Sequence, residues 1–492
     1  MIERAGCERP GASLVKSGFL ARRSSTFRPV KFEKVFSQHM SKYANRPDMD
    51  DRRPRCLLWS FCLLTACLPT LGVMGQTTEP LLPVPPAPSG PQAPPPPGQP
   101  TYPSQTVVQR PRPELDPLGL RIGDFFWFPR GELDEAYNSN IFATPSRTTA
   151  DAITILRPGF DLLSSFPRNE LNLHGSATTQ FYASHSDQNT QDGFVSTDGR
   201  LDVDAGSSFY GSADAAHLHI PRTSTNSPGN AAQPVTYWNY TANAGYRQTG
   251  LRLGYQADIA VQNTQYNGVP AIGGGILPQS ASDTTISQAA LRGSYELVPD
   301  YLSYIRVAGN LTDYTHTVPG GVRFNSTGYR ADLGLQILPR HILSGEIYAG
   351  YLSQIYSASG LGSISGFDAG GRLVYNVTRL TTATFTGLRR VVPSNPTIGT
   401  TGTSYLATIV GANVDHELLR NLLLNGSAGY ENDTYLGVSR TDNIFSVGAG
   451  FKYLLDRNLY LGGSYSYQQR NSTTAGSSYT QNILMLRLSA QF

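Results

Sequence analysis

Apolar and polar residues alternate along most of the chain, and the alternation is clearest in its last ten residues, "ILMLRLSAQF" (483–492). The apolar set in this segment is Leu484, Leu486, Leu488, Ala490 and Phe492. A period of two is typical of a β-strand with one apolar side. Similar segments, such as "LRLGYQADIAV" (251–261) and "LYLGGSYSYQ" (459–468), recur from residue 121 onward without a long helical period. The pattern therefore predicts an all-β fold.

The connections between these segments alternate between short and long. Short ones include "LDRN" (455–458), "LPRH" (338–341) and "SSFYG" (207–211), whereas long ones are rich in Gly, Pro and Ser, as in "NGVPAIGGGILPQSASD" (267–283). A transmembrane barrel has short turns at one end and longer loops at the other, and a β-sandwich has no reason to alternate in this way. We predict an antiparallel up-and-down transmembrane β-barrel of about eighteen strands, with about sixteen as the alternative. Its first strand is expected near Leu133.

The residues before the barrel divide into three segments. Residues 1–48 are an extension or an upstream start that is not used. Residues 49–75 hold three arginines, the apolar run "CLLWSFCLLTACL" and small residues before Gln76, which predicts a signal peptide. "LTAC" also resembles a lipobox, so Cys67 is either lipidated or incidental. Residues 76–120 are Pro-rich and predict an extended periplasmic linker, either a spacer or a partner-binding segment, ahead of the barrel at 121–492.

Composition narrows the class of protein. Charged residues make up 15% of the chain and the formal net charge is +3, whereas soluble domains carry roughly 25% charged residues. Nothing resembles the basic surface of a nucleic-acid binder, so a nucleic-acid partner is not expected. All four cysteines lie at or before residue 67, so the barrel segment has no disulfide framework and no cysteine-based metal site.

The alternation also predicts which side chains line the interior. Arg or Lys on the lipid face costs roughly 2–4 kcal/mol near the membrane midplane, so charges are expected inside wherever parity allows. The predicted pore-lining residues are Arg200, Asp202, Arg247, Arg252, Asp258, Arg292, Glu296, Arg306, Asp332, Glu346, Arg372, Lys452 and Arg487. Together with Arg330, Asp204, Asp368, Asp415 and Glu431, which parity also places inside, the predicted inner face carries nine positive and nine negative residues. The balance indicates either a path of weak charge selectivity or ion pairs that only brace the wall.

Catalytic signatures are not found in the sequence. It contains no HExxH motif, no nucleophile elbow and no GxxxxGK phosphate loop. The "DHE" stretch (415–417) lies in a predicted turn and is interpreted as solvated charge. We expect no enzymatic activity, no cofactor and no metal. The catalytic alternative is a hydrolase whose active-site residues are far apart in the sequence and come together only in the fold.

Several stretches carry a resemblance to a known family. These are "GDFFWFP" (123–129), "EAYNSNIF" (135–142), "DAITILRPGFDL" (151–162) and the terminal aromatic Phe492. Together with the signal segment, they resemble the β-barrel porin type 2 group over residues 121–492. The resemblance implies a location in the bacterial outer membrane and, in some members, an association with exopolysaccharide export. The positions Leu484, Leu486, Leu488 and Phe492 also resemble the signal that the barrel-assembly machinery reads.

Two classes of function follow from these observations. The first is a porin-like channel in the outer membrane, with a possible link to exopolysaccharide export. The second is a structural or adhesion barrel whose lumen is blocked. The expected partners are outer-membrane lipid, the barrel-assembly machinery and, for the first class, polysaccharide or its export components, and the oligomeric state is left open.

Overall fold

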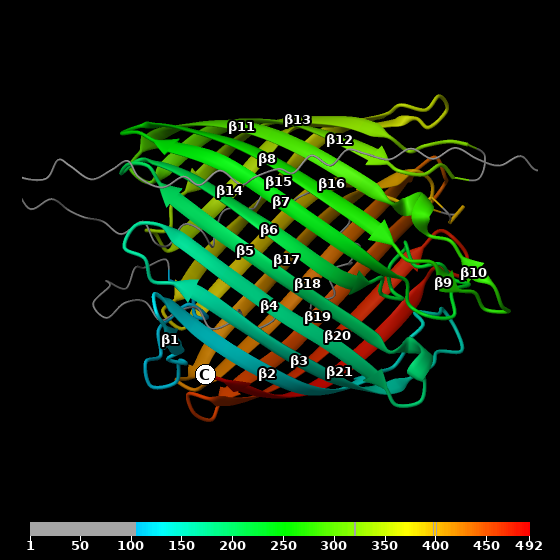
Figure 1. Cartoon of the computed structure of the whole chain (residues 1–492), viewed down its shortest axis with the longest axis horizontal. Coiled ribbons are helices and arrows are strands. Elements are labelled where there is room, and N and C mark those ends of the chain that lie inside the picture. The colour runs from blue at the N-terminus through cyan, green and yellow to red at the C-terminus, as the bar shows by residue number, and fades with distance from the viewer. Residues whose placement is uncertain (1–104, 319–320, 397, 400) are drawn as a thin grey trace, which may run out of the picture. The chain divides into compact units, whose positions relative to one another are not determined.

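A closed antiparallel barrel of eighteen strands accounts for most of the chain (Figure 1). The computed structural model describes residues 105–492 except 319–320, 397 and 400. The barrel strands are β2 (Phe125–Asn138), β3 (Asp151–Ser164), β4 (Glu170–Tyr182), β5 (Thr190–Asp202), β6 (Ser207–His219), β7 (Thr236–Thr249), β8 (Leu253–Tyr266), β11 (Thr284–Val298), β12 (Tyr301–Tyr314), β13 (Ser326–Ile337), β14 (Leu343–Tyr356), β15 (Ser363–Thr378), β16 (Thr381–Pro393), β17 (Ser404–Leu419), β18 (Leu422–Leu436), β19 (Thr441–Leu454), β20 (Leu459–Ser472) and β21 (Tyr479–Gln491). The predicted fold class and strand number are confirmed.

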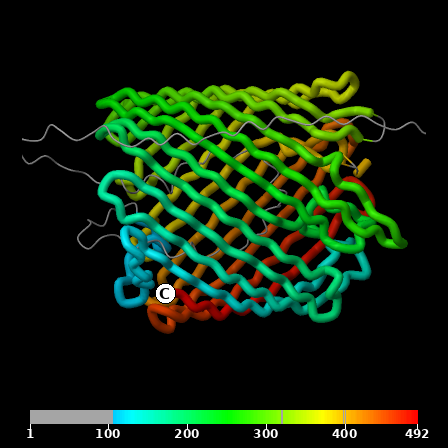
Figure 2. The backbone as a smooth tube through the Cα atoms, in the orientation of Figure 1, coloured from blue at the N-terminus to red at the C-terminus, as the bar shows by residue number. Residues whose placement is uncertain are grey.

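Pairing of the last strand with the first closes the barrel. The register between β2 and β21 runs from Arg130↔Gln491 to Asn138↔Ile483, and every other barrel strand pairs with its neighbours in chain order (Figure 2). A short strand, β1 (Leu120–Ile122), adds a hairpin to the start of β2. Among the eighteen barrel strands in the part of the chain that the structure describes, closure leaves no free sheet edge except where β15 and β16 separate.

Smaller elements lie in the connections. The strands β9 (Val269–Pro270) and β10 (Ile276–Leu277) form a ladder in the loop between β8 and β11. There are also two single 3₁₀ turns. The turn η1 (Ser186–Gln188) lies in the connection between β4 and β5, and η2 (Ser280–Ser282) lies in the connection between β8 and β11. No helix in the part of the chain that the structure describes is long and apolar enough to span a membrane.

The two ends of the barrel differ as the spacing of the segments predicts. The short connections lie at one end together with β1 and the C-terminus, and the long connections, with β9 and β10, lie at the other (Figure 1). We call these the turn end and the loop end. One turn is displaced from its predicted place, because residues 203–206 make the turn and Ser207–Gly211 belong to β6. The strand β5 ends at Asp202, and "DAG" (204–206) lies in the turn, so the turn comes before the Ser-rich stretch at which it was predicted.

The first strand begins earlier than predicted. We expected it near Leu133, but β2 starts at Phe125 and includes most of "GDFFWFP". Consecutive aromatic residues and Pro129 hide the alternation there, although Pro129 still pairs with Phe160 of β3. The segment boundaries at 1–48, 49–75 and most of 76–120 lie outside the described residues, as does Cys67. Residues 105–120, at the end of the predicted linker, are an exception because they contact the barrel.

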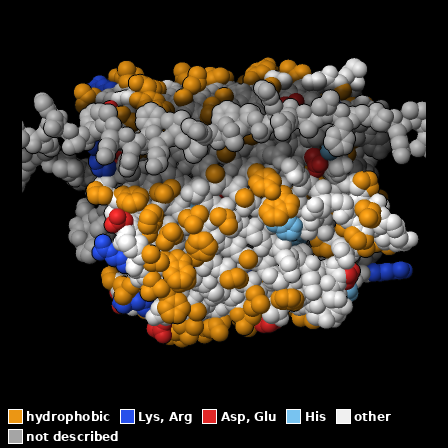
Figure 3. All heavy atoms as spheres, in the orientation of Figure 1, with side chains coloured by type: hydrophobic (Ala, Val, Ile, Leu, Met, Phe, Trp, Pro, Cys, Tyr) orange, Lys and Arg blue, Asp and Glu red, His pale blue; other side chains and the backbone are white. Residues whose placement is uncertain are grey.

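Side chains alternate between the two faces of the wall. On β21 the side chains of Leu484, Leu486 and Leu488 are 43–62% exposed and point outward, while Arg487 between them is bonded inside. Hydrophobic side chains spread over the visible outer face, and charged ones lie mainly toward its ends (Figure 3). An apolar exterior is the surface that lipid requires.

Candidate functional site

The interior of the barrel is the candidate site, and its wall is polar. On β20 the outward residues Leu461 and Tyr465 are exposed, whereas Tyr460 and Gln468 are buried on the inner side. The Tyr460 hydroxyl donates to Glu132 on β2 at 2.7 Å. Small and hydrogen-bonding residues on the inner positions explain why the sequence alternates without being strongly hydrophobic.

Arg292 lies at the centre of an inner-wall cluster that spans β11 to β14. Its guanidinium lies 3.6 Å from the ring centroid of Tyr304, and it pairs with Glu346 at 3.2 Å. The same side chain donates to the Gln336 Oε1 at 2.7 Å. Arg292, Tyr304, Gln336 and Glu346 therefore form one packed unit, because a stacked and doubly bonded guanidinium is held in a single orientation.

A ladder of alternating charge continues from this cluster across β12 to β15. Arg306 donates to the Asp332 Oδ2 through Nε at 3.0 Å and through Nη2 at 2.8 Å. Arg330 pairs with Asp368 and also lies 3.5 Å from Asp332. Both arginines flank the Tyr348 ring, at 4.8 and 5.6 Å from its centroid. The charges neutralise one another, so this part of the wall offers little net charge to a solute.

A second charge network lies where the barrel closes. Arg487 on β21 donates to Asp134 on β2 at 2.8 and 3.0 Å and pairs with Glu132 at 3.2 Å. Arg157 on β3 also contacts Asp134, whose side chain is fully buried. The Lys452 ammonium lies 3.9 Å from the Tyr460 ring centroid beside this network. These contacts tie the last strand to the first two.

The remaining wall carries smaller pairs. Arg200 pairs with Glu170 at 3.2 Å and with Asp202 at 3.0 Å. Arg247 lies over the Tyr210 ring at 5.3 Å, and the Tyr210 hydroxyl donates to Asp258. The structure thus places these predicted residues on the inner wall, each with a neighbour of complementary chemistry.

Three predicted pore-lining residues have a different position from the rest. Arg252 is exposed in the turn between β7 and β8, outside the strands, and its side chain bonds to Tyr295 on the outer face. Glu296 accepts the backbone N–H of Asp300 at 2.9 Å and so caps a turn. Arg372 lies opposite Glu346 in the ladder but is exposed to the lumen. Parity alone assigns a face and does not show where a strand ends.

At the turn end, a segment of chain lies against the barrel. We call residues 105–119 the turn-end segment. The Val107 N–H donates to the Thr382 Oγ1 at 3.0 Å and Val107 is 1% exposed. Arg112 is buried and donates to Glu417 on β17 at 2.7 Å. Arg457, in the turn between β19 and β20, donates to the Pro113 carbonyl at 2.7 Å. The end of the predicted linker is therefore part of the folded barrel.

A second ion pair supports this segment. Arg420 donates to the Glu114 Oε1 at 2.7 Å and to the Pro111 carbonyl at 2.9 Å. This hydrogen bond lowers the pKa of Glu114 below its ordinary value, so the carboxylate stays ionised and paired at neutral pH. Glu417 also lies 3.5 Å from Arg110. The expectation of solvated charge at 415–417 was wrong for Glu417, which is buried in a strand and anchors the segment.

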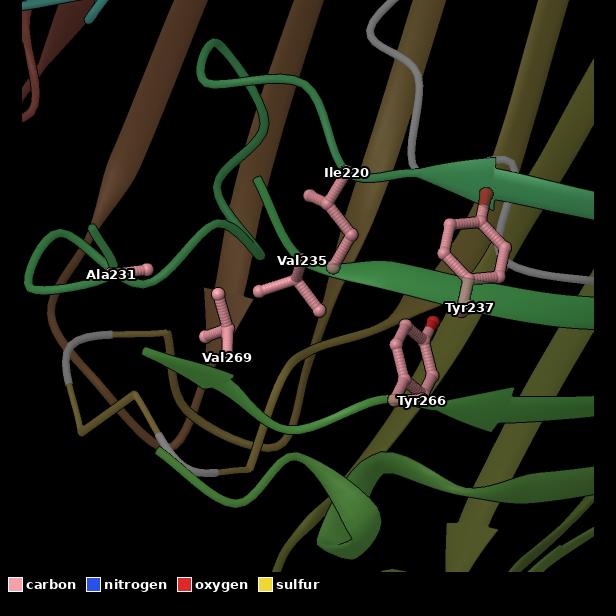
Figure 4. Close-up of a cluster of buried hydrophobic side chains, with 6 residues drawn as sticks. All are labelled: Ile220, Ala231, Val235, Tyr237, Tyr266 and Val269. Atoms are coloured by element: carbon pink, nitrogen blue, oxygen red, sulfur yellow. The ribbon is translucent and has the colours of Figure 1, made fainter. Parts of the chain in front are cut away.

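At the loop end, the connection between β6 and β7 folds across the barrel, and we call residues 220–235 the strap. Its base is an apolar cluster of buried residues (Figure 4). The cluster consists of Ile220, Ala231, Val235, Tyr237, Tyr266 and Val269. Tyr237 on β7 and Tyr266 on β8 pack with ring centroids 5.1 Å apart. Burial of these side chains holds both ends of the strap at the wall it leaves.

The middle of the strap reaches strands on the opposite side. Asn226 accepts the Asn395 N–H through Oδ1 at 2.8 Å, and its carbonyl accepts from the Asn395 Nδ2 at 3.1 Å. Asn226 also donates to the Pro393 carbonyl at the end of β16 at 3.3 Å. Arg470 on β20 donates to the Thr223 carbonyl. The Asn395 Nδ2 further donates to Gln279 at 3.0 Å, so three loops meet at one buried amide.

The arrangement supports passage or closure more readily than catalysis. Among the residues that the structure describes, no group of three or more His, Cys, Asp or Glu side chains could hold a metal ion. Several charged groups of the wall are held in ion pairs, such as Arg306–Asp332 and Arg487–Asp134. The turn-end segment and the strap lie at opposite ends of one polar interior.

A family comparison covers this architecture. A model described as Putative beta-barrel porin 2 matches residues 112–492. The chain belongs to this family. Membership and the closed barrel place the protein in the bacterial outer membrane as a porin-like barrel. The match includes Arg112 and the rest of the turn-end segment after it. None of the curated proteins compared with the chain matches it.

Solved structures with a related outline are distant. OccAB3 of Acinetobacter baumannii is 12% identical, with 75% of this chain and 100% of that chain covered and a TM-score of 0.40. OpdK of Pseudomonas aeruginosa with vanillate is 10% identical, with 74% and 99% covered and a TM-score of 0.41. The alcaligin receptor FauA of Bordetella pertussis is 11% identical, with 76% of each chain covered and a TM-score of 0.36. These likenesses do not indicate what this barrel carries.

Sequence reasoning missed the residues at both ends. Glu417, Arg112, Asn226 and Asn395 carry the contacts of the turn-end segment and the strap, but none was a predicted site residue. The only signal was weak, namely two arginines that alternate with two prolines in "QRPRPELD" (109–116) and an Asn in each of two long connections. Phe492 is 54% exposed, and its N–H donates to the Pro129 carbonyl at 3.1 Å.

Proposed function

We propose that the barrel is a porin-like channel for an uncharged or weakly charged hydrophilic chain, with a closure at each end. The observation that carries the proposal is the paired charge of the inner wall, as in Arg306–Asp332 and Arg487–Asp134. Neutralised pairs brace the wall and leave amides and hydroxyls, such as Asn243 bonded to Ser212, between them. A wall of this kind does not strongly select ions of one sign.

The solute that we propose is an exported polysaccharide. A neutral glycan carries many hydroxyl groups and no fixed charge, so it matches a polar wall whose charges are already paired. The family resemblance to members associated with exopolysaccharide export supports the same choice. The polysaccharide would then leave the barrel at the loop end, past the strap. The turn-end segment would contact export components in the periplasm.

Conductance in planar bilayers tests the channel. We expect small or rare currents from the whole barrel and larger currents after deletion of residues 105–119 or after Asn395→Ala at the strap. The matched controls are Arg121→Ala, exposed on β1, and Asn267→Ala, whose side chain donates only to Thr236 near the loop end. Dextran on one side should reduce the enlarged current if a glycan chain enters the lumen.

The alternative function is a structural or adhesion barrel with a blocked lumen. The segments that fold onto both ends favour it, because each is hydrogen-bonded to the wall or to a neighbouring loop at its end of the barrel. A lumen that stays silent when both closures are removed, in protein that is folded and inserted, would support this alternative over the channel. Loss of secreted polysaccharide in a strain without the protein, restored by the wild-type chain, separately tests the proposed cargo.

A further inference from the structure

The ladder between β15 and β16 ends halfway up the wall. Its register runs from Thr378↔Thr381 at the turn to Gly371↔Gly387, and no pairing continues above that point. On the far side of each strand, β15 stays paired with β14 up to Ser363, and β16 stays paired with β17 up to Pro393. Residues 363–370 and 388–393 are therefore two facing strand edges without a shared ladder. We call this place the fork.

Above the fork the two halves of the wall overlap. Leu352 on β14 and Ile364 on β15 lie on the inward face of their strands, yet they form one buried apolar cluster with Val391 of β16. Val391 is on the same face of β16 as Phe385, which is 50% exposed and points outward. The inner side of β14–β15 thus covers the outer side of β16, with Leu406 and Leu436 beside the cluster.

One side chain bridges the fork. Arg389 lies on the outer face of β16 and donates from Nη1 to the Phe367 carbonyl at 2.8 Å, while its Nε is buried without a hydrogen-bond partner. Phe367 itself is 61% exposed on the outer face of β15, opposite Tyr351. In lipid, an unpaired strand edge is costly, because nothing there can bond to it. At the fork, two strand edges therefore lack the ladder that joins them nearer the turn.

The sequence also fits a continuous ladder. Extending the Gly371↔Gly387 register upward places Ala369 opposite Arg389, Asp368 opposite Arg390 and Phe367 opposite Val391. Phe367 and Val391 would then form an aromatic and β-branched pair on the outer face, and Asp368 and Arg390 an opposite-charge pair inside. Pairs of both kinds stabilise antiparallel strands. One sequence therefore supports a forked and a zipped arrangement.

Glycines surround the point where the two arrangements diverge. A Cβ at Gly371 would lie 2.3 Å from the Glu346 carbonyl, and one at Gly370 would lie 2.7 Å from the Gly387 carbonyl. Backbones approach closely there, and glycine gives them the freedom to bend. On the lumen side, the inner face of β16–β18 carries an apolar cluster of Val392, Tyr405, Ala407, Ile409 and Tyr435. At the fork, apolar side chains therefore lie on the outer face of the wall, between the overlapping strands and on the face toward the lumen.

We propose that the fork is a lateral gate between the lumen and the outer leaflet of the membrane. In the zipped arrangement the wall is continuous, and in the forked arrangement an apolar chain can pass between β15 and β16. The molecule that fits is an amphiphile with an acyl chain, since its tail would follow the apolar surfaces while its polar head stays in the lumen. This sideways route goes beyond the axial passage proposed above and does not depend on it.

Pairs of introduced cysteines distinguish the arrangements, because the barrel contains no cysteine of its own. Phe367→Cys with Val391→Cys can be joined by a short thiol crosslinker only when zipped, since the forked state puts the two residues on opposite sides of β15. Ile364→Cys with Val391→Cys reports the forked state. Phe367→Cys with Tyr351→Cys, neighbours in both states, is the positive control, and Val391→Cys alone is the negative control. A protease site in the turn between β15 and β16 reveals the crosslink of either test pair on a denaturing gel, and a site in the loop between β14 and β15 reveals that of the control pair.

We expect both test pairs to crosslink in the same membrane preparation. Reaction of the Ile364–Val391 pair alone, with the control pair fully joined, would show a static fork and overturn the gate. Reaction of the Phe367–Val391 pair alone would show that the wall is always zipped and would also overturn it.

Passage is tested with a phospholipid that carries a photoreactive acyl chain in reconstituted vesicles. We expect labelling of the inner peptide around Val392 and Tyr405, and its loss after the zipped pair is crosslinked. Labelling of the lipid-facing peptide around Leu486 should not change. Absence of the inner label, or an inner label that the crosslink does not reduce, would overturn the proposed passage. Axial conductance is a separate measurement, so either proposal can fail alone.

Discussion

At the residue scale, the decisive groups are charges whose partners lie on neighbouring strands. Asp134 is fully buried and receives Arg487 and Arg157 from the two strands that flank β2. Removing one partner of a buried ion pair costs more than the pair contributes, because the remaining charge is left uncompensated. The closing strands are therefore held by two carboxylates, Asp134 and Glu132, that serve the same two arginines, and Asp134 makes the shorter contacts.

Asp134→Asn should lower the free energy of unfolding by about 3 kcal/mol, since it removes the buried carboxylate nearest to both arginines and leaves them only Glu132 as a shared anion. The measurement is the urea midpoint of the heat-modifiable folded band. Glu135→Gln is the matched control, because Glu135 is the next residue and bonds only to Thr154 on the exposed outer face. Equal midpoints for the two variants would contradict the assigned role of Asp134.

Arg306 and Arg372 should respond differently to the same substitution. Arg306 is 8% exposed and doubly bonded to Asp332, so Arg306→Gln should destabilise the barrel by about 2 kcal/mol or more. Arg372 is exposed to the lumen and has no ion-pair partner among the described residues, so Arg372→Gln should leave stability unchanged and move the reversal potential toward cations. A shift in stability for both, or for neither, would show that the burial of these side chains has been misassigned.

At the element scale, the sequence predicted strands better than contacts. Alternation identified the inner face of β11 to β14, because every inward side chain repeats at a period of two and charge is costly in lipid. It could not pair Arg330 with Asp368, two strands away, because that contact depends on strand tilt and side-chain reach. Glu417 was missed for a similar reason, since its partner Arg112 comes from a proline-rich segment with no periodicity.

The last strand should also depend on its final residue. Deleting Phe492 should reduce insertion if the assembly machinery reads the terminal aromatic, although the deletion removes only one backbone bond, to Pro129. The amount of heat-modifiable protein in the outer membrane is the readout. Phe451→Ala, another exposed aromatic on the outer face, is the control. Similar losses in both variants would indicate lost lipid contact and not a lost signal.

At the scale of the whole molecule, the asymmetry of the two ends fixes an orientation. Short turns face the periplasm and long loops face outward in barrels of this class. A cysteine at Gly476, between β20 and β21, should react with a membrane-impermeant maleimide on intact cells. A cysteine at Asp456, in the turn between β19 and β20, should react only after the outer membrane is permeabilised. The reverse pattern would invert the assignment of the two ends.

Both closures rest on the same sector of the wall. The turn-end segment contacts Thr382, Glu417 and Arg457 on β16, β17 and the turn before β20, and the strap meets the other ends of β16 and β20 through Pro393 and Arg470. If this sector shifts as a unit, the two closures are thermodynamically linked. Linkage is reciprocal, so release of the inner closure would ease the outer one by the same factor that release of the outer would ease the inner. A ligand bound on the periplasmic side could then be sensed at the cell surface without entering the lumen.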